Sequence, residues 1–519
     1  MKTTPTASPP QPHVPSRRDQ AGALAAVCLA ALTLPLSFTG GAVATPAIGR
    51  DLGGSSLALQ WITNAFMLSF GSLLLTAGAL ADMFGRKRLF TGGVSCFSVA
   101  ALAITCAPSI AWLDVLRAVQ GIAAAGALAG GTAALAQEFD GSARVRAFSL
   151  LGTSFGAGLA FGPVLAGWFI EHFGWRSVFL SSALIGMVAL LLGLATMRES
   201  HDPAAMGFDR FGALSFSSAL GLFTWGILLW PASGGASLHA WGLLGAAALA
   251  LLVFLHVERR THRPLLDLSL FRYPRFIGVQ MLPVATCYCY VVLLVLLPLR
   301  FIGVQGQDEV TAGLTMIALS IPMLVVPSVA AGLTRWASAG NLSAIGLLIA
   351  ALGLWWLSHV APLDAQASLL GPLLVIGTGT ALPWGLMDGL AVSVVPKERA
   401  GMATGIFSTT RVAGEGVAIA IVSTLLTWLI EAHLPENLSV HRLATAQHLA
   451  MGDIGSAARQ ANLDAHALIH VYDDAFRCLI YFLIIITVAC ALLVSWLLRE
   501  TLRPVQVDLT SCETGHRPR

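Results

Sequence analysis

Long apolar segments recur along this 519-residue chain and constrain its fold more than any other feature. A run of 18 or more residues with few charges is typical of a membrane-spanning helix, because a backbone inside a bilayer must satisfy its own hydrogen bonds. Only 11% of the residues are charged, against roughly a quarter in soluble chains, which excludes a soluble fold. The sequence predicts an all-α integral membrane protein with fourteen spans, at about 22–44, 58–80, 89–107, 110–137, 145–170, 175–197, 211–230, 237–257, 276–299, 311–334, 341–359, 367–394, 401–430 and 474–498.

The distribution of positive charge predicts the orientation of the chain. Most of the 30 Lys and Arg residues fall on the same side as the N-terminus, so the positive-inside rule places both termini in the cytoplasm. The predicted parts are a disordered tail, a six-helix bundle, two extra helices with a basic loop, a second six-helix bundle and a C-terminal tail. Their ranges are 1–20, 21–198, 199–275, 276–498 and 499–519, with a long external loop at 431–473.

Composition also argues against several functions. A net charge of +3 is too small to indicate a nucleic-acid partner. No nucleophile motif, nucleotide-binding loop or ligand-spaced cysteine pair indicates an enzyme, a metal or a cofactor. The external loop is rich in histidine, but the spacing fits no tight metal-ligand set, so a solvated, partly helical cap is favoured; the residues are His433, His441, His448, His466 and His470.

A short polar stretch, GALADMFGRKR at 78–88, separates the second and third apolar runs. Gly78 and Gly85 let the backbone turn tightly between two helices. Asp82 can accept hydrogen bonds from a helix start or pair with Arg86 or Arg88. By composition this is an ordinary basic loop, but its order resembles the G-x-L-a-D-x-x-G-R-[RK] loop between helices 2 and 3 of the major facilitator superfamily. The resemblance implies that these five residues act in gating.

The start of the second span carries a further resemblance. Gln60-Trp61 followed by Phe66 is similar to the entry of helix 2 in the fourteen-helix drug:proton antiporter branch, the EmrB/QacA type. Trp61 alone would suit an interfacial belt. Membership of this branch implies a substrate cavity between the bundles, and Ser37, Asn64 and Phe66 are its predicted lining.

Arg117 lies inside the fourth predicted span, where a charge is costly and usually functional. The string LRAVQG at 116–121 resembles the superfamily's R-x-x-Q-G motif, which implies a role for Arg117 in proton transfer. Asp114, one turn earlier, is predicted to pair with it. The alternative is that Arg117 snorkels to the external surface, because it lies only about two turns into the span.

The fifth span carries small residues at four-residue spacing, which let helices approach closely. Gly158, Gly162, Pro163 and Gly167 resemble the G-x-x-x-G-P-x-x-G-G antiporter motif of exporters, with Ala166 as a mild departure. Pro163 removes an internal hydrogen bond and is predicted to kink the helix.

The first span departs from the branch, because Ser37 stands where relatives usually have a proton-carrying Asp. A buried acid elsewhere is therefore expected to carry the proton. Glu415 lies roughly 20 Å from the cytoplasmic end of a core about 30 Å thick and one turn from Arg411, with which it can pair. That pair is either structural or a proton or substrate site. Asp388 is the second candidate.

The resemblance implies a proton-coupled antiporter in the bacterial inner membrane that exports small amphiphilic molecules such as drugs or biocides. A dedicated exporter of a metabolite such as a siderophore is an alternative, and so is a transporter or sensor without proton coupling. The expected partners are the substrate, protons and the lipid bilayer, and a periplasmic adaptor with an outer-membrane channel is a further one.

Overall fold

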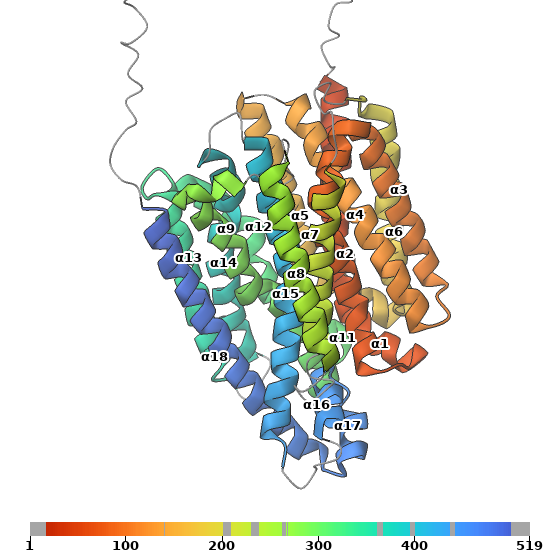
Figure 1. Ribbon diagram of the computed structural model, residues 1–519. Helices are drawn as coiled ribbons and strands as arrows, with labels where there is room; N and C mark the ends of the chain where they lie inside the picture. The colour runs from red at the N-terminus through yellow and green to blue at the C-terminus, as the bar shows by residue number, and fades with distance from the viewer. Residues whose placement is uncertain are drawn as a thin grey trace, which may run out of the picture.

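The computed structural model describes residues 17–139, 141–200, 209–229, 238–261, 266, 268–360, 367–394, 400–435 and 442–499. This part of the chain is built of helices and contains no strand (Figure 1). The α-helices are α1 (Arg17–Leu52), α2 (Ser56–Phe84), α3 (Arg86–Thr105), α4 (Ile110–Glu138), α5 (Gly141–Phe173), α6 (Arg176–Thr196), α7 (Arg210–Leu229), α8 (Leu238–Arg260), α9 (Pro274–Thr286), α10 (Val292–Pro298), α11 (Glu309–Ser320), α12 (Pro322–Leu333), α13 (Ala339–Leu357), α14 (Ala367–Ser393), α15 (Ala400–His433), α16 (Arg442–Ala450), α17 (Ile454–Ala461) and α18 (Ala465–Leu497). Three short turns are η2 (Leu268–Arg272), η3 (Cys287–Val291) and η4 (Leu299–Val304).

Thirteen of the described helical segments are long and apolar enough to span a membrane, which confirms a multi-pass membrane protein. Of the fourteen predicted spans, the one at 211–230 is not in this set, although α7 is helical there. The N-terminal tail was predicted too long, because residues 17–20 already belong to α1. Contacts with distant residues hold this first turn in place: Arg198 pairs with Asp19 at 3.0 Å, and the Gln20 amide donates to the Glu138 carbonyl. Apart from Arg499, the rest of the predicted tails lies outside the described residues.

The long helices pack into two groups. In the first, α2 packs on α4, α3 on α4 and α6, and α1 on α5 and α6. In the second, α13 packs on α14 and α18, α11 and α12 pack on α14, and α15 packs on α18. The groups meet along two main seams, where α15 packs on α2 and α11 packs on α5.

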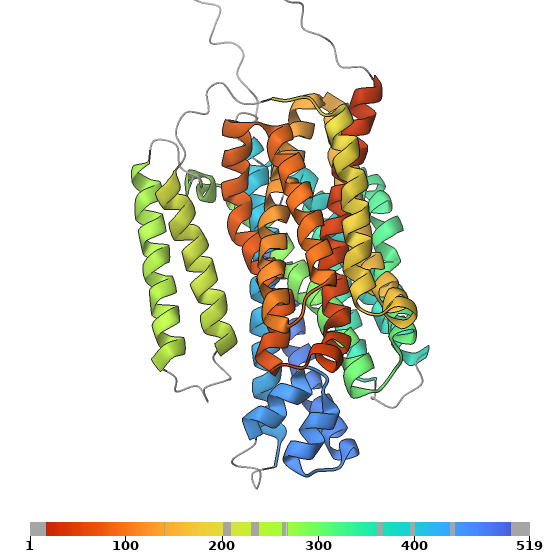
Figure 2. The same cartoon turned by 90° about the vertical axis from the view of Figure 1, so that its right-hand side faces the viewer.

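Helices α7 and α8 form a hairpin that stands beside the two groups (Figure 2). The hairpin touches them through α7, which packs on α2 and α15. The Ser217 hydroxyl donates to the Ser72 carbonyl at 2.9 Å, and Trp225 meets Trp61 edge to face with ring centroids 6.3 Å apart. Helix α8 is the least buried of the thirteen segments, so one of its faces is left for lipid.

One segment, Pro274–Val304, is much the most buried of the thirteen. It contains α9, η3, α10 and η4 in succession. The turns η3 and η4 are π-helical, and such turns break the regular helical ladder and often mark functional positions. This segment therefore supplies side chains to the interior of the second group.

The two ends of the molecule differ. Helix α1 begins and α18 ends at one end, here called the terminal end, while α16 and α17 cover the other, here called the cap end (Figure 1). The cap docks through glycine: a Cβ on Gly303 would lie 2.5 Å from the Gly452 Cα atom. Gly452 also has a φ of +78°, which favours glycine.

Candidate functional site

The predicted gating loop closes α2 and opens α3 at the terminal end. Gly85 ends α2 with a φ of +110°, a conformation that favours glycine. Arg86 donates through Nε and Nη2 to Asp82 Oδ1 at 3.1 and 2.9 Å, so the predicted ion pair is present. Arg86 also donates to the Gln137 side chain at the end of α4. The loop is thereby tied to a neighbouring helix of its own group.

Glu199, which the sequence analysis missed, completes this loop. Its carboxylate accepts from the backbone N–H groups of Lys87 and Arg88, both at 3.2 Å, and lies 3.5 Å from the Arg88 guanidinium. These N–H groups are the unpaired donors at the start of α3, where a negative charge is favourable. An added Cβ at Gly85 would collide with the same carboxylate. Glu199 lies 112 residues after Lys87, so the sequence around the loop does not indicate this contact.

Arg117 is fully buried, which excludes snorkelling to the surface. Its Nε donates to the Ile62 carbonyl at 2.8 Å, and Nη1 donates to Ser37 Oγ at 3.3 Å and Gln120 Oε1 at 2.9 Å. The guanidinium lies 4.4 Å from the Phe66 ring centre. Ser37 and Phe66 are thus brought together by Arg117 across α1, α2 and α4.

Asp114 and Arg117 make no direct ion pair among the described residues, although their charges still interact. The guanidinium turns toward α1 and α2, while Asp114 Oδ1 is buried and has no hydrogen-bond partner among the described residues. The Arg117 guanidinium contacts the Ile62 carbonyl and the Phe66 ring, and not the Asp114 carboxylate on its own helix. Asn64, the third predicted cavity residue, donates to the Gln60 carbonyl of its own helix at 2.9 Å.

The antiporter-like motif on α5 has two packing surfaces. At Gly158 and Gly162, an added Cβ would collide with the Leu32 carbonyl and the Thr39 side chain of α1. At Gly167, it would collide with the Glu309 carbonyl at the start of α11. Pro163 lies within an α5 that continues to Phe173. The motif therefore packs α5 within the first group and, nearer the cap end, against the second group.

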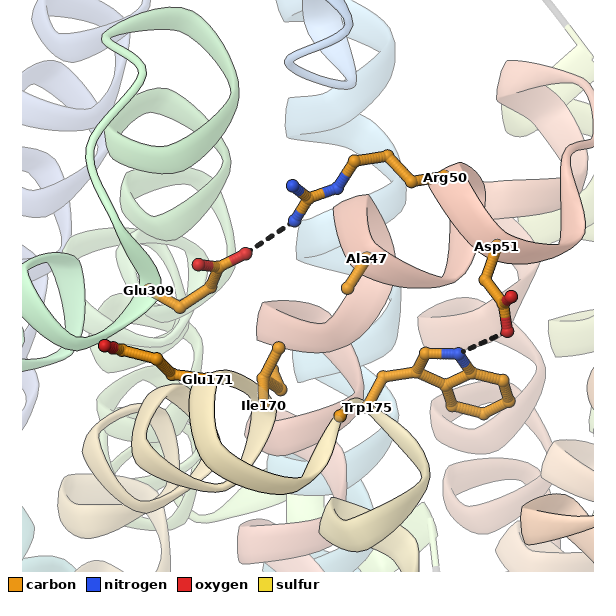
Figure 3. Close-up of a pocket in the computed structure, with 8 residues that line it drawn as sticks. Ala47, Arg50, Asp51, Ile170, Glu171, Trp175 and Glu309 are labelled. Atoms are coloured by element: carbon orange, nitrogen blue, oxygen red, sulfur yellow. Dashed lines mark hydrogen bonds and ion pairs between the residues drawn. The ribbon is translucent and has the colours of Figure 1, made fainter.

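The seam between α5 and α11 is closed at the cap end by charge as well as by packing. Arg50 Nη2 lies 2.5 Å from Glu309 Oε1 and so links α1 to α11 (Figure 3). The adjacent Asp51 carboxylate accepts from Trp175 Nε1 at 3.0 Å and pairs with Arg176 at 2.7 Å. Arg50, Glu309, Asp51 and Trp175 line an open hollow together with Ala47, Ile170, Glu171 and Gly174. The sequence analysis did not identify Arg50 or Glu309.

Arg411 and Glu415 make no direct ion pair among the described residues, although the charge of Arg411 still acts on Glu415. Arg411 Nη1 lies 3.3 Å from Asp388 Oδ1, so the second candidate acid on α14 takes the cation. Glu415 is only 2% exposed, and its Oε1 has no hydrogen-bond partner among the described residues. The four-residue spacing of Arg411 and Glu415 allows an ion pair on α15. Because α14 packs beside α15, Arg411 instead pairs with Asp388 of α14. Glu415 is thereby left as a buried acid without a direct ion-pair partner among the described residues.

Aromatic side chains that the sequence analysis missed surround this ion pair. The Arg411 guanidinium lies 5.1 Å from the Phe155 ring centre of α5 and 5.6 Å from that of Phe407. Trp384, one turn before Asp388, lies with its ring centre 6.3 Å from that of Tyr290 on η3. Added Cβ atoms on Gly156 and Gly152 would lie 3.6 Å from Trp384 Nε1 and 3.3 Å from Asp388 Oδ2. This cluster, called the Arg411 cluster below, joins α5 of the first group to η3, α14 and α15 of the second.

Two groups of spanning helices that meet around buried charged side chains define a membrane transport protein. A family model described as Major Facilitator Superfamily matches residues 26–419, and the chain belongs to that superfamily. The chain is a transporter and not an enzyme. The predicted resemblance is therefore confirmed.

Curated relatives agree with this assignment. The chain is 31% identical to a Mycobacterium tuberculosis protein named multidrug resistance protein Stp, over 78% of this chain and 76% of that one. It is 30% identical to a tetracenomycin C resistance and export protein of Streptomyces glaucescens, over 80% and 77% of the two chains. It is 32% identical to the cephamycin export protein CmcT of Amycolatopsis lactamdurans, over 74% and 80%. These similarities support the drug:proton antiporter branch and an exporter of drugs.

Solved structures share the fold. A bacterial homologue of the human lysosomal transporter Spinster, in an inward-facing and unoccupied conformation, superposes with a TM-score of 0.63 at 14% identity. The match covers 93% of this chain and 97% of the other. At this identity the similarity shows the fold alone.

Proposed function

We propose that this protein is a proton-coupled antiporter that exports small amphiphilic molecules across the bacterial cytoplasmic membrane. The observation that carries the proposal is Glu415, a buried acid with an unpartnered oxygen beside the Arg411–Asp388 ion pair. Arg411 and Asp388 neutralise each other, so protonation of Glu415 changes the net charge of the cluster from −1 to zero. Such a change favours different conformations of two groups that meet at this place.

The proposed topology has fourteen spans, with α7 as the span that pairs with α8, and both termini in the cytoplasm. The six-helix groups 21–198 and 276–498 then alternate access to a site between them. The terminal end is cytoplasmic and the cap end is external. The Asp82–Arg86 pair stabilises one state of the cytoplasmic gate, and Arg117 holds α1, α2 and α4 together as the proton moves.

The names of the relatives favour a second candidate, an exporter dedicated to one antibiotic-like metabolite. Two of the relatives carry the names of single exported compounds, tetracenomycin C and cephamycin, while Stp carries a multidrug name. Efflux of a compound panel from an exporter-deficient host separates the two, because a dedicated exporter protects against one chemical class only.

The test of coupling is substrate-induced proton release from the purified protein, titrated against pH. Glu415→Gln is expected to abolish release and the pH dependence of transport while some substrate binding remains. Asp464→Asn, at an exposed acid that makes no side-chain cap to α18, is the matched control and should release protons as the wild type does. If Glu415→Gln also released protons normally, coupling would lie at Asp388 or Asp114 instead.

A further inference from the structure

Helices α13 and α18 lie side by side along one edge of the second group and run in opposite directions (Figure 1). Contacts at both ends fix this arrangement. An added Cβ on Gly340, at the start of α13, would lie 2.6 Å from Leu498 Cβ at the end of α18. At the other end, Arg477 Nε of α18 donates to the Ser358 carbonyl, just after α13, at 3.2 Å. The first residues of α13 and the last residues of α18 therefore lie together at the terminal end.

A groove with a volume of about 420 Å³ lies between the two helices near this end. Two small buried residues, Ala344 and Ala491, form its floor. Its walls are the side chains of Ile345, Leu348 and Leu492, which are exposed on the outer surface of the second group. Because α13 and α18 are long and apolar enough to span a membrane, this part of the groove suits a lipid acyl chain.

Three polar side chains line the groove at its terminal end, and they are Asn341, Ser495 and Arg499. None of the three side chains has a hydrogen-bond or ion-pair partner among the described residues. Arg499 is exposed, so its charge is available to a ligand from outside the bundle. The groove thus changes along its length from apolar to polar and cationic.

Two tryptophans place this polar end at the membrane interface. Trp496, next to Ser495, is 64% exposed, and Trp336, three residues before α13, is 79% exposed. Exposed tryptophans of membrane proteins are enriched at the level of the lipid headgroups. Leu348 and Leu492 lie roughly 10 Å deeper along their helices than the polar residues, at the level of the acyl chains.

We propose that this groove binds a glycerophospholipid with a net negative headgroup, such as phosphatidylglycerol. The phosphate oxygens accept from the Arg499 guanidinium, and Asn341 and Ser495 hydrogen-bond to further headgroup oxygens. None of the eight lining residues is acidic, so the groove offers no partner to the ammonium of a zwitterionic lipid. This site lies on the outer surface of the second group, and its occupant does not depend on the transported substrate or on proton coupling.

The two ends of the groove can be perturbed separately. Arg499→Gln removes the charge at an exposed position, where a polar side chain remains. Leu492→Ala shortens a wall residue that is 63% exposed. The matched control is Arg260→Gln, because Arg260 is an exposed arginine in the last turn of α8 and does not line the groove.

The experiment is native mass spectrometry of the purified full-length protein, titrated with phosphatidylglycerol and with phosphatidylcholine of the same acyl chains. The wild type is expected to bind one phosphatidylglycerol about fivefold more tightly than phosphatidylcholine, as for one cation beside an anionic headgroup. Arg499→Gln should lose this preference while binding of phosphatidylcholine is unchanged. Leu492→Ala should weaken both lipids alike, and Arg260→Gln should bind as the wild type does.

Three results would overturn the inference. The first is a wild type without a preference for phosphatidylglycerol, or a preference that survives in Arg499→Gln. The second is an equal loss of the preference in Arg260→Gln, which would leave only general attraction to surface charge. The third is a lipid-free dimer that dissociates in Leu492→Ala, which would show that a second copy of the chain covers the groove.

Discussion

Gly167→Ala tests whether the contact between α5 and α11 controls access from the cap end. The added methyl group would collide with the Glu309 carbonyl, which belongs to the backbone of the other group and cannot turn aside as a side chain can. Overpacking of this kind costs about 1–3 kcal/mol. The gain in helix propensity from Gly to Ala is about 1 kcal/mol, but it applies whether or not the two groups touch. The cost therefore falls selectively on the conformation in which this seam is closed.

A cost of about 1–3 kcal/mol corresponds to a shift of roughly 5- to 150-fold in the ratio of the seam-closed to the seam-open state. Hydrogen exchange followed by mass spectrometry reads this shift, because opening exposes the backbone of α5 and α11 near the cap end. Faster exchange is expected in peptides that cover 160–173 and 305–314, together with altered transport.

Gly92→Ala is the matched control for this experiment. Gly92 is also a helical glycine of the first group, but an added Cβ there meets nothing within 4 Å. Its exchange and transport should equal those of the wild type. Unchanged protection of both cap-end peptides in Gly167→Ala, with normal transport, would refute the gating role of this seam.

Three further predictions concern the loop, the α5 motif and the cap. Asp82→Asn should impair transport at normal membrane insertion, because a partly exposed ion pair contributes only about 0.2–1 kcal/mol to stability; normal efflux from an inserted variant would exclude gating by the loop. Gly162→Leu and Pro163→Ala should both lose exchange at near-normal expression, the first by collision with Thr39 and the second by straightening α5, and normal transport by both would make the motif accidental. Asp453→Ala should lower the stability of the cap by about 1 kcal/mol at neutral pH, since Asp453 caps α17 at Ser456. Burial alone would raise the pKa of Asp453, but hydrogen bonds from Ser456 and the charge of His448 outweigh burial and lower the pKa. The stabilisation by Asp453 is therefore fully present above the ordinary pKa near 3.9 and is lost as the pH falls through the lowered value. Thermal unfolding of the wild type and of Asp453→Ala, at neutral pH and at a pH below the lowered value, measures this contribution.

The spans and the local turns could be predicted because their signals lie in adjacent residues. An apolar run long enough to cross a bilayer predicts a spanning helix, and a glycine followed by three basic residues predicts the turn at Gly85. The pair between Asp82 and Arg86 is correct for the same reason, since the two residues lie four positions apart on either side of the turn at Gly85.

Partners across helices could not be predicted, because helical spacing lists only the neighbours on the same helix. Arg411 and Arg117 each have an acid one turn away, and each binds a group on another helix instead. Likewise Arg300 forms a buried pair with Asp473 at 2.8 Å across 173 residues, although the sequence places Arg300 at the end of a span. These choices depend on how helices of the bundle approach one another, which a single sequence does not state.

The ion pair between Arg411 and Asp388 strengthens the proposal that Glu415 carries the proton. A Glu415 that was paired with Arg411 would favour the charged form in every conformation, and a proton would have to break an ion pair to bind. In the observed arrangement Asp388 holds the cation, and Glu415 can gain or lose a proton without breaking a bond in this cluster. In the proposed mechanism Glu415, in the second group, takes the place of the acid that is missing at Ser37. Ser37 itself accepts a hydrogen bond from the buried Arg117 in the first group. The two arginines then have different tasks: Arg117 joins three helices within the first group, and Arg411 pairs with Asp388 beside the proposed proton carrier.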